Sequence, residues 1–151
     1  MGNPKPPAPP APGGRGVHVM RYRTAYAETD QMGRIYYGHF VTWLERARTE
    51  LLRDLGIRYR DLESTGLFLP VRSLEIRYRR APRYDEILTF ATVVDSTRRA
   101  SVAFVTAFYA EDGELLATGC VEVAAIDRNG APARIPDPIR RRLAEAASLS
   151  G

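Results

Sequence analysis

Apolar side chains recur with a helical period between His39 and Leu55. They lie three and four residues apart in one stripe that two neighbours widen: Phe40, Leu44, Ala47, Leu51 and Leu55, with Val41 and Leu52 beside them. This spacing predicts an amphipathic helix over 39–55. Gly56 follows it and is typical of a helix end, because glycine adopts the left-handed conformation without steric cost.

Alternation with a period of two predicts the strands. Residues 18–26 and 71–79 alternate apolar and polar side chains. In 85–96, 100–110 and 114–127, by contrast, apolar side chains occur on both phases, that is, in both alternating sets of positions, which face opposite sides of a sheet. A strand that is apolar on both phases needs cover on both faces, from its own chain or from a partner. The three longer segments are therefore predicted to lie in the middle of a sheet or against a second subunit.

Turn signals and two short helical segments complete the layout. "EDGE" at 111–114 predicts a hairpin, because Asp-Gly accepts positive φ, and "STRRA" at 96–100 predicts a second, basic turn. Residues 58–65 and 136–147 favour a helical turn and a terminal helix. One strand, a long helix and four further strands predict the α+β class, with a five-stranded antiparallel sheet wrapped around the helix.

The chain divides into a tail and one domain. Residues 1–16 are rich in proline and glycine and predict a disordered or extended tail, and 17–151 form a single domain of ordinary size. No apolar run approaches the roughly 18 residues that a membrane span needs, and no signal peptide is visible. We therefore expect a cytoplasmic protein without a membrane span.

The net charge of +4 comes from a basic excess that is almost entirely arginine, with Lys5 the only lysine. Arginine suits phosphate, because its planar fork binds two oxygens at once. Cys120, the single cysteine, cannot form a disulfide within the chain and is expected to be a small core residue. With two histidines and one cysteine, a structural zinc site is not expected.

The loop "ETDQMGRIYYGHF" at 28–40 carries the candidate chemistry. Asp30 lies just before a helix whose start has no Ser, Thr, Asp or Asn to cap it. Uncapped amides at a helix start carry partial positive charge and can hold a carbonyl oxygen as it gains charge. Asp30 would then attack that carbonyl or activate water beside it. The alternative is that Asp30 caps the helix itself or pairs with an arginine.

The run Asp30-x-x-Gly33-x-x-Tyr36-Tyr37-x-x-Phe40, followed by "WLERARTELLRDLGI" at 43–57, resembles the hotdog-fold acyl-CoA thioesterases of the 4-hydroxybenzoyl-CoA thioesterase type. The bacterial Tol–Pal-associated branch is the most similar. The likeness extends from Val17 to Asp127 and includes "YRRAPRYDEIL", which looks like the family's strand-turn-strand. The resemblance implies the same wrapped helix and an assembly of two or four copies.

The resemblance also implies roles for single residues. Asp30 matches the catalytic aspartate, as nucleophile or general base, and Tyr37 matches the helix-start residue whose backbone N–H polarises the thioester carbonyl, with the Gly38 backbone beside it. Tyrosine stands where the Tol–Pal branch often has histidine, and a phenol with a pKa near 10 is a poor base. Asp30 would therefore act without a histidine.

Further residues of the helix and loop have weaker assignments. His39 stands where the family often has asparagine, and we consider a structural and a substrate-lining role equally. Gly33 and Tyr36 are expected beside the substrate. Glu45 has the helical position of the acid in related hotdog enzymes, but we favour a supporting role, through an ion pair with Arg48 or across a dimer.

Coenzyme A phosphates are expected at a basic turn. Arg98 and Arg99 lie in the predicted turn between two long strands, and Thr97 and Ser101 would add hydroxyl donors; the alternative is a solvated turn. The arginines of "YRRAPR" at 78–83 are weaker candidates of the same kind. No nucleic-acid motif accompanies them, so no nucleic-acid partner is expected.

These features predict an enzyme that hydrolyses the thioester of an acyl-CoA. No metal or redox cofactor is implied, and coenzyme A enters as part of the substrate. The rival prediction is a non-hydrolytic acyl-CoA-binding or regulatory hotdog protein, for which loss of the loop acid would be typical. Short, long and aromatic acyl groups stay open, as does an acyl carrier protein thioester. The expected partner is a second copy of the chain, in a homodimer or homotetramer.

Overall fold

The computed structural model describes residues 5–151, so residues 1–4 of the predicted tail lie outside the described part. In chain order the elements are β1 His18–Arg23, the 3-10 helix η1 Tyr26–Glu28, α1 His39–Asp54, α2 Tyr59–Ser64, β2 Val71–Tyr78, β3 Ile87–Thr97, β4 Ser101–Tyr109, β5 Leu115–Ala124 and α3 Asp137–Ser150. The long helix ends where the sequence predicted, with Gly56 in the left-handed region at φ +78°. The terminal helix α3 is longer than predicted.

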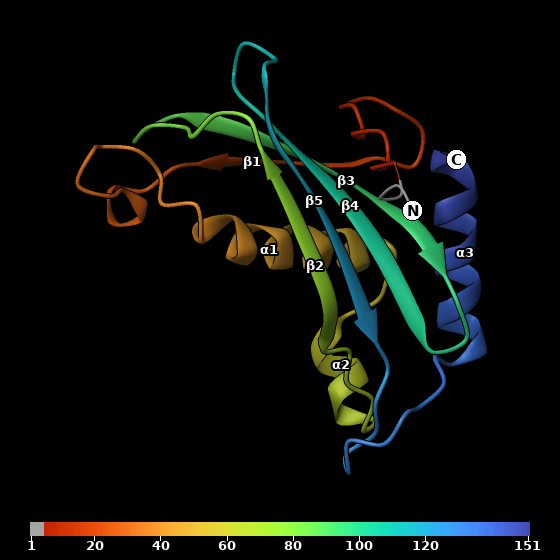
Figure 1. Cartoon of the computed structure of the whole chain (residues 1–151). Helices are drawn as coiled ribbons and strands as arrows, with labels where there is room; N and C mark the ends of the chain where they lie inside the picture. The colour runs from red at the N-terminus through yellow and green to blue at the C-terminus, as the bar shows by residue number, and fades with distance from the viewer. Residues whose placement is uncertain (1–4) are drawn as a thin grey trace.

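The five strands form one antiparallel sheet in the order β1-β3-β4-β5-β2. The sheet curves around α1, which lies across its concave face (Figure 1). This arrangement confirms the predicted α+β fold with a central helix and five strands. The central strands β3 and β4 are mostly buried, in keeping with their two apolar phases.

The core between α1 and the sheet is aromatic. Phe40 and Trp43 on the buried face of α1 meet Phe90 of β3 and Phe108 of β4, with ring centroids 5.0 Å apart for Phe40–Phe108 and 5.6 Å apart for Trp43–Phe90. Gly119 of β5 lets the helix approach the sheet, because a Cβ there would lie 2.6 Å from the Leu44 side chain. These contacts fix α1, and therefore the loop that enters it.

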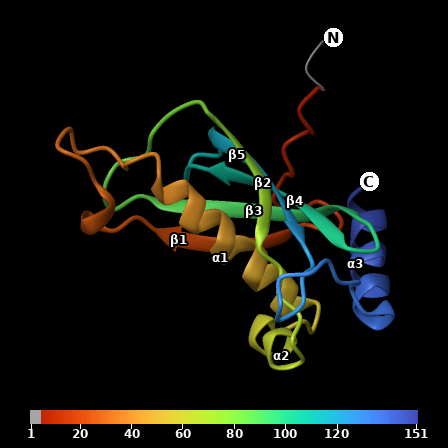
Figure 2. The same ribbon diagram turned by 60° about the horizontal axis from the view of Figure 1, so that its bottom comes forward.

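The outer face of the sheet is covered in part by the two ends of the chain. The Tyr109 hydroxyl donates to the Pro10 carbonyl at 2.8 Å, and the Ser150 hydroxyl donates to the Val94 carbonyl at 3.2 Å. Residues 5–16 have no regular secondary structure and lie along this face, next to α3 (Figure 2). The sequence left open whether the chain itself or a partner subunit covers this apolar face, and the chain's own two ends cover part of it.

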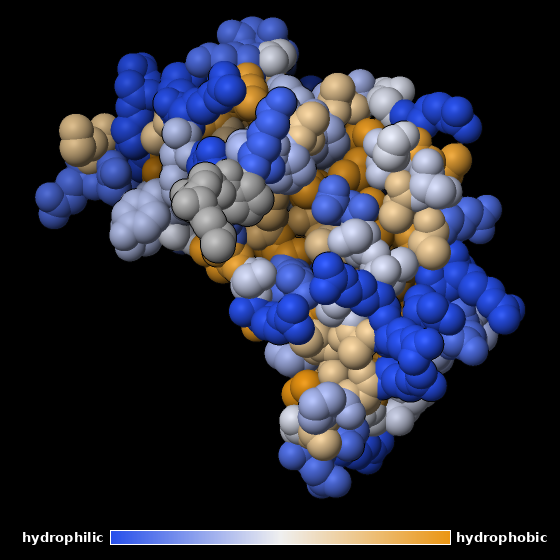
Figure 3. Space-filling model, turned by 45° about the vertical axis from the view of Figure 1, so that its right-hand side comes forward, coloured by the Kyte–Doolittle hydropathy of each residue, from blue (hydrophilic) through white to orange (hydrophobic). Residues whose placement is uncertain are grey.

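The face that carries α3 combines hydrophilic and apolar surface. Figure 3 shows groups of strongly hydrophilic side chains there, with apolar patches between them.

Burial raises the pKa of the Cys120 thiol, which lies partly buried on β5, so this cysteine is a weak nucleophile. Among the helices of residues 5–151, none has the length and hydrophobicity to cross a membrane.

Strand β2 is a terminal strand of the sheet and the most exposed of the five. Within residues 5–151 it pairs with β5 alone, which leaves its other edge without a neighbouring strand. Val71, Leu74 and Tyr78 are 46%, 39% and 45% exposed. An edge with free backbone groups and apolar side chains is suited to pairing with another chain.

Candidate active site

The loop before α1 is a small hairpin that projects from the body of the molecule, in orange at the left of Figure 1. Thr29 and Ile35 form an isolated antiparallel bridge, and the Asp30 N–H donates to the Arg34 carbonyl at 2.7 Å. The Gly33 N–H donates a hydrogen bond to the Asp30 carbonyl at 3.1 Å, and Gly33 has a positive φ of +73°. Glycine accepts this conformation readily, which accounts for its place in the turn.

The Asp30 carboxylate is held by its own loop. Its Oδ1 accepts the backbone N–H groups of Met32 at 2.8 Å and Arg34 at 3.1 Å. Neither alternative from the sequence is found within residues 5–151: Asp30 neither caps α1 nor pairs with an arginine side chain. One oxygen therefore orients the carboxylate, and Oδ2 has no hydrogen bond to any described residue.

The start of α1 has no side-chain cap, as predicted. The amides of residues 39–41 each donate to the carbonyl three residues earlier, at 3.1, 3.3 and 3.2 Å. Because these bonds satisfy the amides of residues 39–41, those amides are not available to bind a substrate oxygen. The N–H groups of Tyr37 and Gly38, one step earlier, have no acceptor among the described residues. They are the donors that could receive a substrate oxygen.

Tyr78 of β2 orients one of these donors. Its hydroxyl donates to the Tyr37 carbonyl at 2.9 Å, and this carbonyl belongs to the same peptide unit as the Gly38 N–H. A hydrogen bond on the carbonyl fixes the plane of that peptide and strengthens the N–H as a donor. Burial raises the pKa of Tyr78, so the phenol stays protonated and able to donate. Tyr78 was not among the site residues predicted from the sequence, although it follows Leu74 and Ile76 on the helix-facing side of β2.

Aromatic side chains surround the same peptide. The rings of Tyr36 and Tyr37 lie 4.6 Å apart, and His39 stands edge-on to Tyr36 at 6.0 Å. Gly38 leaves room for the Tyr36 ring, since a Cβ there would lie 2.7 Å from Tyr36 Cε1. The neighbouring Tyr37 phenol raises the pKa of Tyr36, so the Tyr36 hydroxyl stays protonated at neutral pH and does not act as a base. The predicted residues 36–39 are thus brought together.

Glu28 is a second residue that sequence analysis missed. Its Oε2 accepts the Tyr22 hydroxyl at 2.8 Å and the Trp43 indole N–H at 2.7 Å, and its Oε1 accepts the Ala25 N–H at 2.6 Å. One carboxylate therefore ties β1, the start of the loop and α1 together. Little in the sequence indicates this role, because Glu28 lies two residues before Asp30 in a polar loop without helical or strand periodicity.

Comparison with known proteins adds four findings to this geometry: a family match, two relatives and one solved structure. The model of the thioesterase-like superfamily matches residues 25–143. YneP of Bacillus subtilis (strain 168) is 36% identical over 101 residues, 66% of this chain and 73% of YneP. The acyl-CoA thioester hydrolase YbgC of Escherichia coli O157:H7 is 30% identical over 105 residues, 70% of this chain and 78% of YbgC. The crystal structure of the DHNA-CoA thioesterase of Staphylococcus aureus has a TM-score of 0.80 and 32% identity, over 87% of this chain and 89% of that one.

The chain belongs to the thioesterase-like superfamily. Membership agrees with the resemblance in the sequence and with the hotdog arrangement of α1 and the sheet. The chain is accordingly a thioesterase-family enzyme. The finer assignment to the Tol–Pal-associated branch stays a prediction.

Replacing Tyr78 with phenylalanine tests its part in this candidate site. The variant keeps the ring that packs on Phe40 but removes the bond to the Tyr37 carbonyl. A net hydrogen bond contributes about 0.5–1.5 kcal/mol, so we expect kcat to fall roughly 2- to 10-fold with little change in KM. Steady-state kinetics measure both. Tyr84→Phe, at an exposed ring beside Tyr26, is the matched control, and an equal loss in both variants would contradict the role.

Glu45 lies on the exposed side of α1. Within residues 5–151 it forms no ion pair, so the predicted pair with Arg48 is not found in one chain. Burial lowers the pKa of the Arg48 guanidinium, and the charge of Glu45 acts against that shift. Glu45 therefore acts on Arg48 only through its electrostatic field, without an ion pair. An ion pair of Glu45 across a dimer stays a prediction.

The predicted coenzyme A turn lies far from Asp30 within one chain. Residues 97–101 connect the end of β3 to β4, whereas the start of β3 pairs with Arg23 near the Asp30 loop. The 11 residues of β3 separate the two ends by roughly 35 Å. One chain does not bring Thr97, Arg98, Arg99 and Ser101 to the same place as Asp30.

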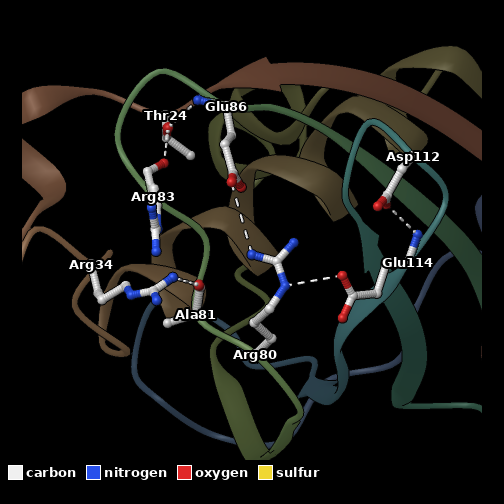
Figure 4. A network of polar contacts seen from close by, with 8 residues as sticks. All are labelled: Thr24, Arg34, Arg80, Ala81, Arg83, Glu86, Asp112 and Glu114. Atoms are coloured by element: carbon white, nitrogen blue, oxygen red, sulfur yellow. Dashed lines mark hydrogen bonds and ion pairs between the residues drawn. The ribbon is translucent and has the colours of Figure 1, made fainter.

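The other basic turn, residues 79–86 between β2 and β3, lies directly against the Asp30 loop. The Ile35 N–H donates to the Pro82 carbonyl at 2.9 Å, and the Arg34 guanidinium reaches the Ala81 carbonyl at 3.4 Å. Figure 4 shows Arg80 held between Glu114, at 3.0 Å, and Glu86, at 3.8 Å. These ion pairs already compensate the charge of Arg80, so its observed role is to support the loop.

Proposed function

We propose that this protein is an acyl-CoA thioesterase that hydrolyses the substrate to a free acid and coenzyme A. The observation that carries the proposal is that the loop before α1 supplies both a fixed carboxylate and two backbone amides without an acceptor. Asp30 is oriented through one oxygen, and the N–H groups of Tyr37 and Gly38 stand at the start of α1 without an acceptor in the described chain. The name of the relative YbgC, an acyl-CoA thioester hydrolase, supports the substrate class.

The thioester carbonyl would be bound by the Tyr37 and Gly38 amides. As the carbonyl carbon becomes tetrahedral its oxygen gains negative charge, which the two N–H groups and the partial positive charge of the helix start stabilise. Asp30 either attacks that carbon to form a mixed anhydride, or takes a proton from the attacking water. In both routes the C–S bond breaks, the thiolate leaves as coenzyme A, and water supplies the oxygen of the product acid.

The carboxylate acts without a histidine in this proposal. The side chain at the oxyanion position is Tyr37, a weak base at neutral pH. Thioesters have little resonance stabilisation, so one carboxylate and two oriented amides are a sufficient set without a metal or redox cofactor. A non-hydrolytic acyl-CoA-binding protein is the second candidate; it would bind the same ligand and release no thiol.

Hydrolysis of an acyl-CoA panel separates these candidates. The full chain is assayed with short-chain, long-chain and aromatic acyl-CoA, and with an acyl carrier protein thioester, with detection of free thiol. We expect turnover of at least one coenzyme A thioester. Tight binding across the panel with no release of thiol would overturn the enzyme and favour the binding protein.

We further propose that a second copy of the chain completes the site. The Asp30 loop projects from the body, and Tyr37 is 63% exposed, so a bound thioester would meet water on one side. A site that excludes water strengthens the electrostatic interactions that stabilise the transition state. Strand β2, which carries Tyr78, has a free edge and exposed apolar side chains that a second copy could cover.

A further inference from the structure

Glu28 lies at the base of the Asp30 hairpin, where the two arms of the hairpin meet. Its backbone carbonyl accepts the Tyr36 N–H at 3.0 Å, which joins one arm to the other. Asp30 follows Glu28 by two residues, and Tyr37 follows Tyr36 directly. A shift of Glu28 is therefore passed both to the candidate catalytic carboxylate and to the amides at the start of α1.

The side chain of Glu28 is bonded to the aromatic core. Its Oε2 accepts the indole N–H of Trp43 at 2.7 Å and the hydroxyl of Tyr22 at 2.8 Å. Trp43 is 1% exposed, and its ring packs against those of Phe40, 4.7 Å away, and Phe90, 5.6 Å away. Because the core fixes this indole, the hydrogen bond from the indole fixes the Glu28 carboxylate and with it the base of the hairpin.

The three donors around Glu28 require a carboxylate. Its Oε1 accepts the Ala25 N–H at 2.6 Å, while Oε2 accepts the donors of Trp43 and Tyr22. An ionised carboxylate accepts on both oxygens, whereas a glutamine has one oxygen and one –NH2 group. In either orientation a glutamine would therefore place its –NH2 against the N–H of Ala25 or of Trp43.

These hydrogen bonds also balance the charge of Glu28. No lysine, arginine or histidine of residues 5–151 forms an ion pair with it. Hydrogen bonds to an ionised group are shorter and about twice as strong as neutral ones. Burial, together with the bond to Glu28, raises the pKa of Tyr22, so this phenol stays protonated and keeps donating.

We propose that Glu28 is a positioning residue of the candidate active site. Its bond to Trp43 holds the Asp30 carboxylate and the two amides at the start of α1 in a fixed relation to each other. A displacement of about 1 Å in such a group can cost about 100-fold in rate. The effect on rate rests on the proposed function, whereas the geometry that Glu28 holds is measurable without a substrate.

Nuclear magnetic resonance measures this geometry. Trp43 is the only tryptophan of the chain, so the isotope-labelled full chain gives one indole N–H signal. In Glu28→Gln we expect that signal to move upfield, because its acceptor loses the negative charge. The backbone amide signals of Tyr37 and Gly38 should move with it. Tyr22→Phe, which removes one donor and keeps the ring, should change the same signals to a smaller extent.

Steady-state kinetics with an acyl-CoA from the panel measure the consequence for the rate. We expect Glu28→Gln to lower kcat about 10- to 100-fold and to change KM less than about threefold, because the substrate still binds beside misplaced groups. Thr106→Val is the matched control, since it removes the buried hydrogen bond to Thr92 at 3.0 Å. Thr92 pairs with His18, at the end of β1 away from the loop. Both variants should lose thermal stability, and the control should keep its kcat.

The two measurements together decide the role. A loss of kcat in Glu28→Gln no larger than that in Thr106→Val would overturn it, and so would unmoved amide signals of Tyr37 and Gly38. Should Glu28→Gln fail to fold, Tyr22→Phe decides the same two points. A wild type that hydrolyses no thioester would overturn the proposed function, while coupled shifts of the indole and amide signals would still support the geometry that Glu28 holds.

Discussion

Replacing Asp30 with asparagine is expected to reduce kcat by roughly 10²- to 10⁴-fold, the usual contribution of a positioned acid or base. The substitution is isosteric, and its Oδ1 can still accept the N–H groups of Met32 and Arg34. The hairpin should therefore keep its shape while the negative charge is lost. Thiol release at saturating acyl-CoA gives kcat, and calorimetric titration with a non-hydrolysable thioether analogue gives affinity, which we expect to change little.

Glu45→Gln is the matched control, because it neutralises the other candidate carboxylate on an exposed face of α1. Its kcat should stay near that of the wild type. A near-normal rate in the Asp30 variant together with a large loss in the Glu45 variant would reverse the assignment. Equal losses in the two variants, with intact affinity, would show that the carboxylates act as a pair.

Local patterns were enough to predict the fold because its main elements are strongly periodic. The stripe from Phe40 to Leu55 specifies a helix, and the two apolar phases of β3 and β4 specify buried central strands. The cover of the outer face could not be predicted in the same way. Residues 5–16 have no period, and their place depends on single contacts such as the Tyr109–Pro10 hydrogen bond.

The candidate site was predictable where its residues are neighbours in the sequence. Asp30, Tyr37 and Gly38 lie in one loop, so spacing alone places them together. Glu28 was also in that loop, but its role depends on Trp43 and Tyr22, which meet it only after folding. The distance of Arg99 from Asp30 could not be foreseen without the strand order, which sends β3 away from the loop.

The other prediction with a large effect concerns assembly through β2. Light scattering should show at least a dimer of the wild type at micromolar concentration. Leu74→Asp places a charge on the apolar, helix-facing side of this edge strand, at a position that is 39% exposed in one chain. Removing an anchor residue of an interface commonly costs about 2 kcal/mol or more, so dimer affinity should fall about 30-fold or more. A site completed by a second copy should lose activity in step with the fraction of dimer.

Val19→Asp is the matched control for this variant. Val19 is 42% exposed on β1, at the opposite edge of the sheet, so the same charge is added to a similar surface away from β2. We expect this control to stay dimeric and active, because a charge at an exposed position away from the interface costs little. A monomeric wild type with full activity would refute both the assembly and the shared site. A Leu74→Asp monomer with full kcat would refute the shared site alone, since the chain would then exclude water from its own Asp30 loop.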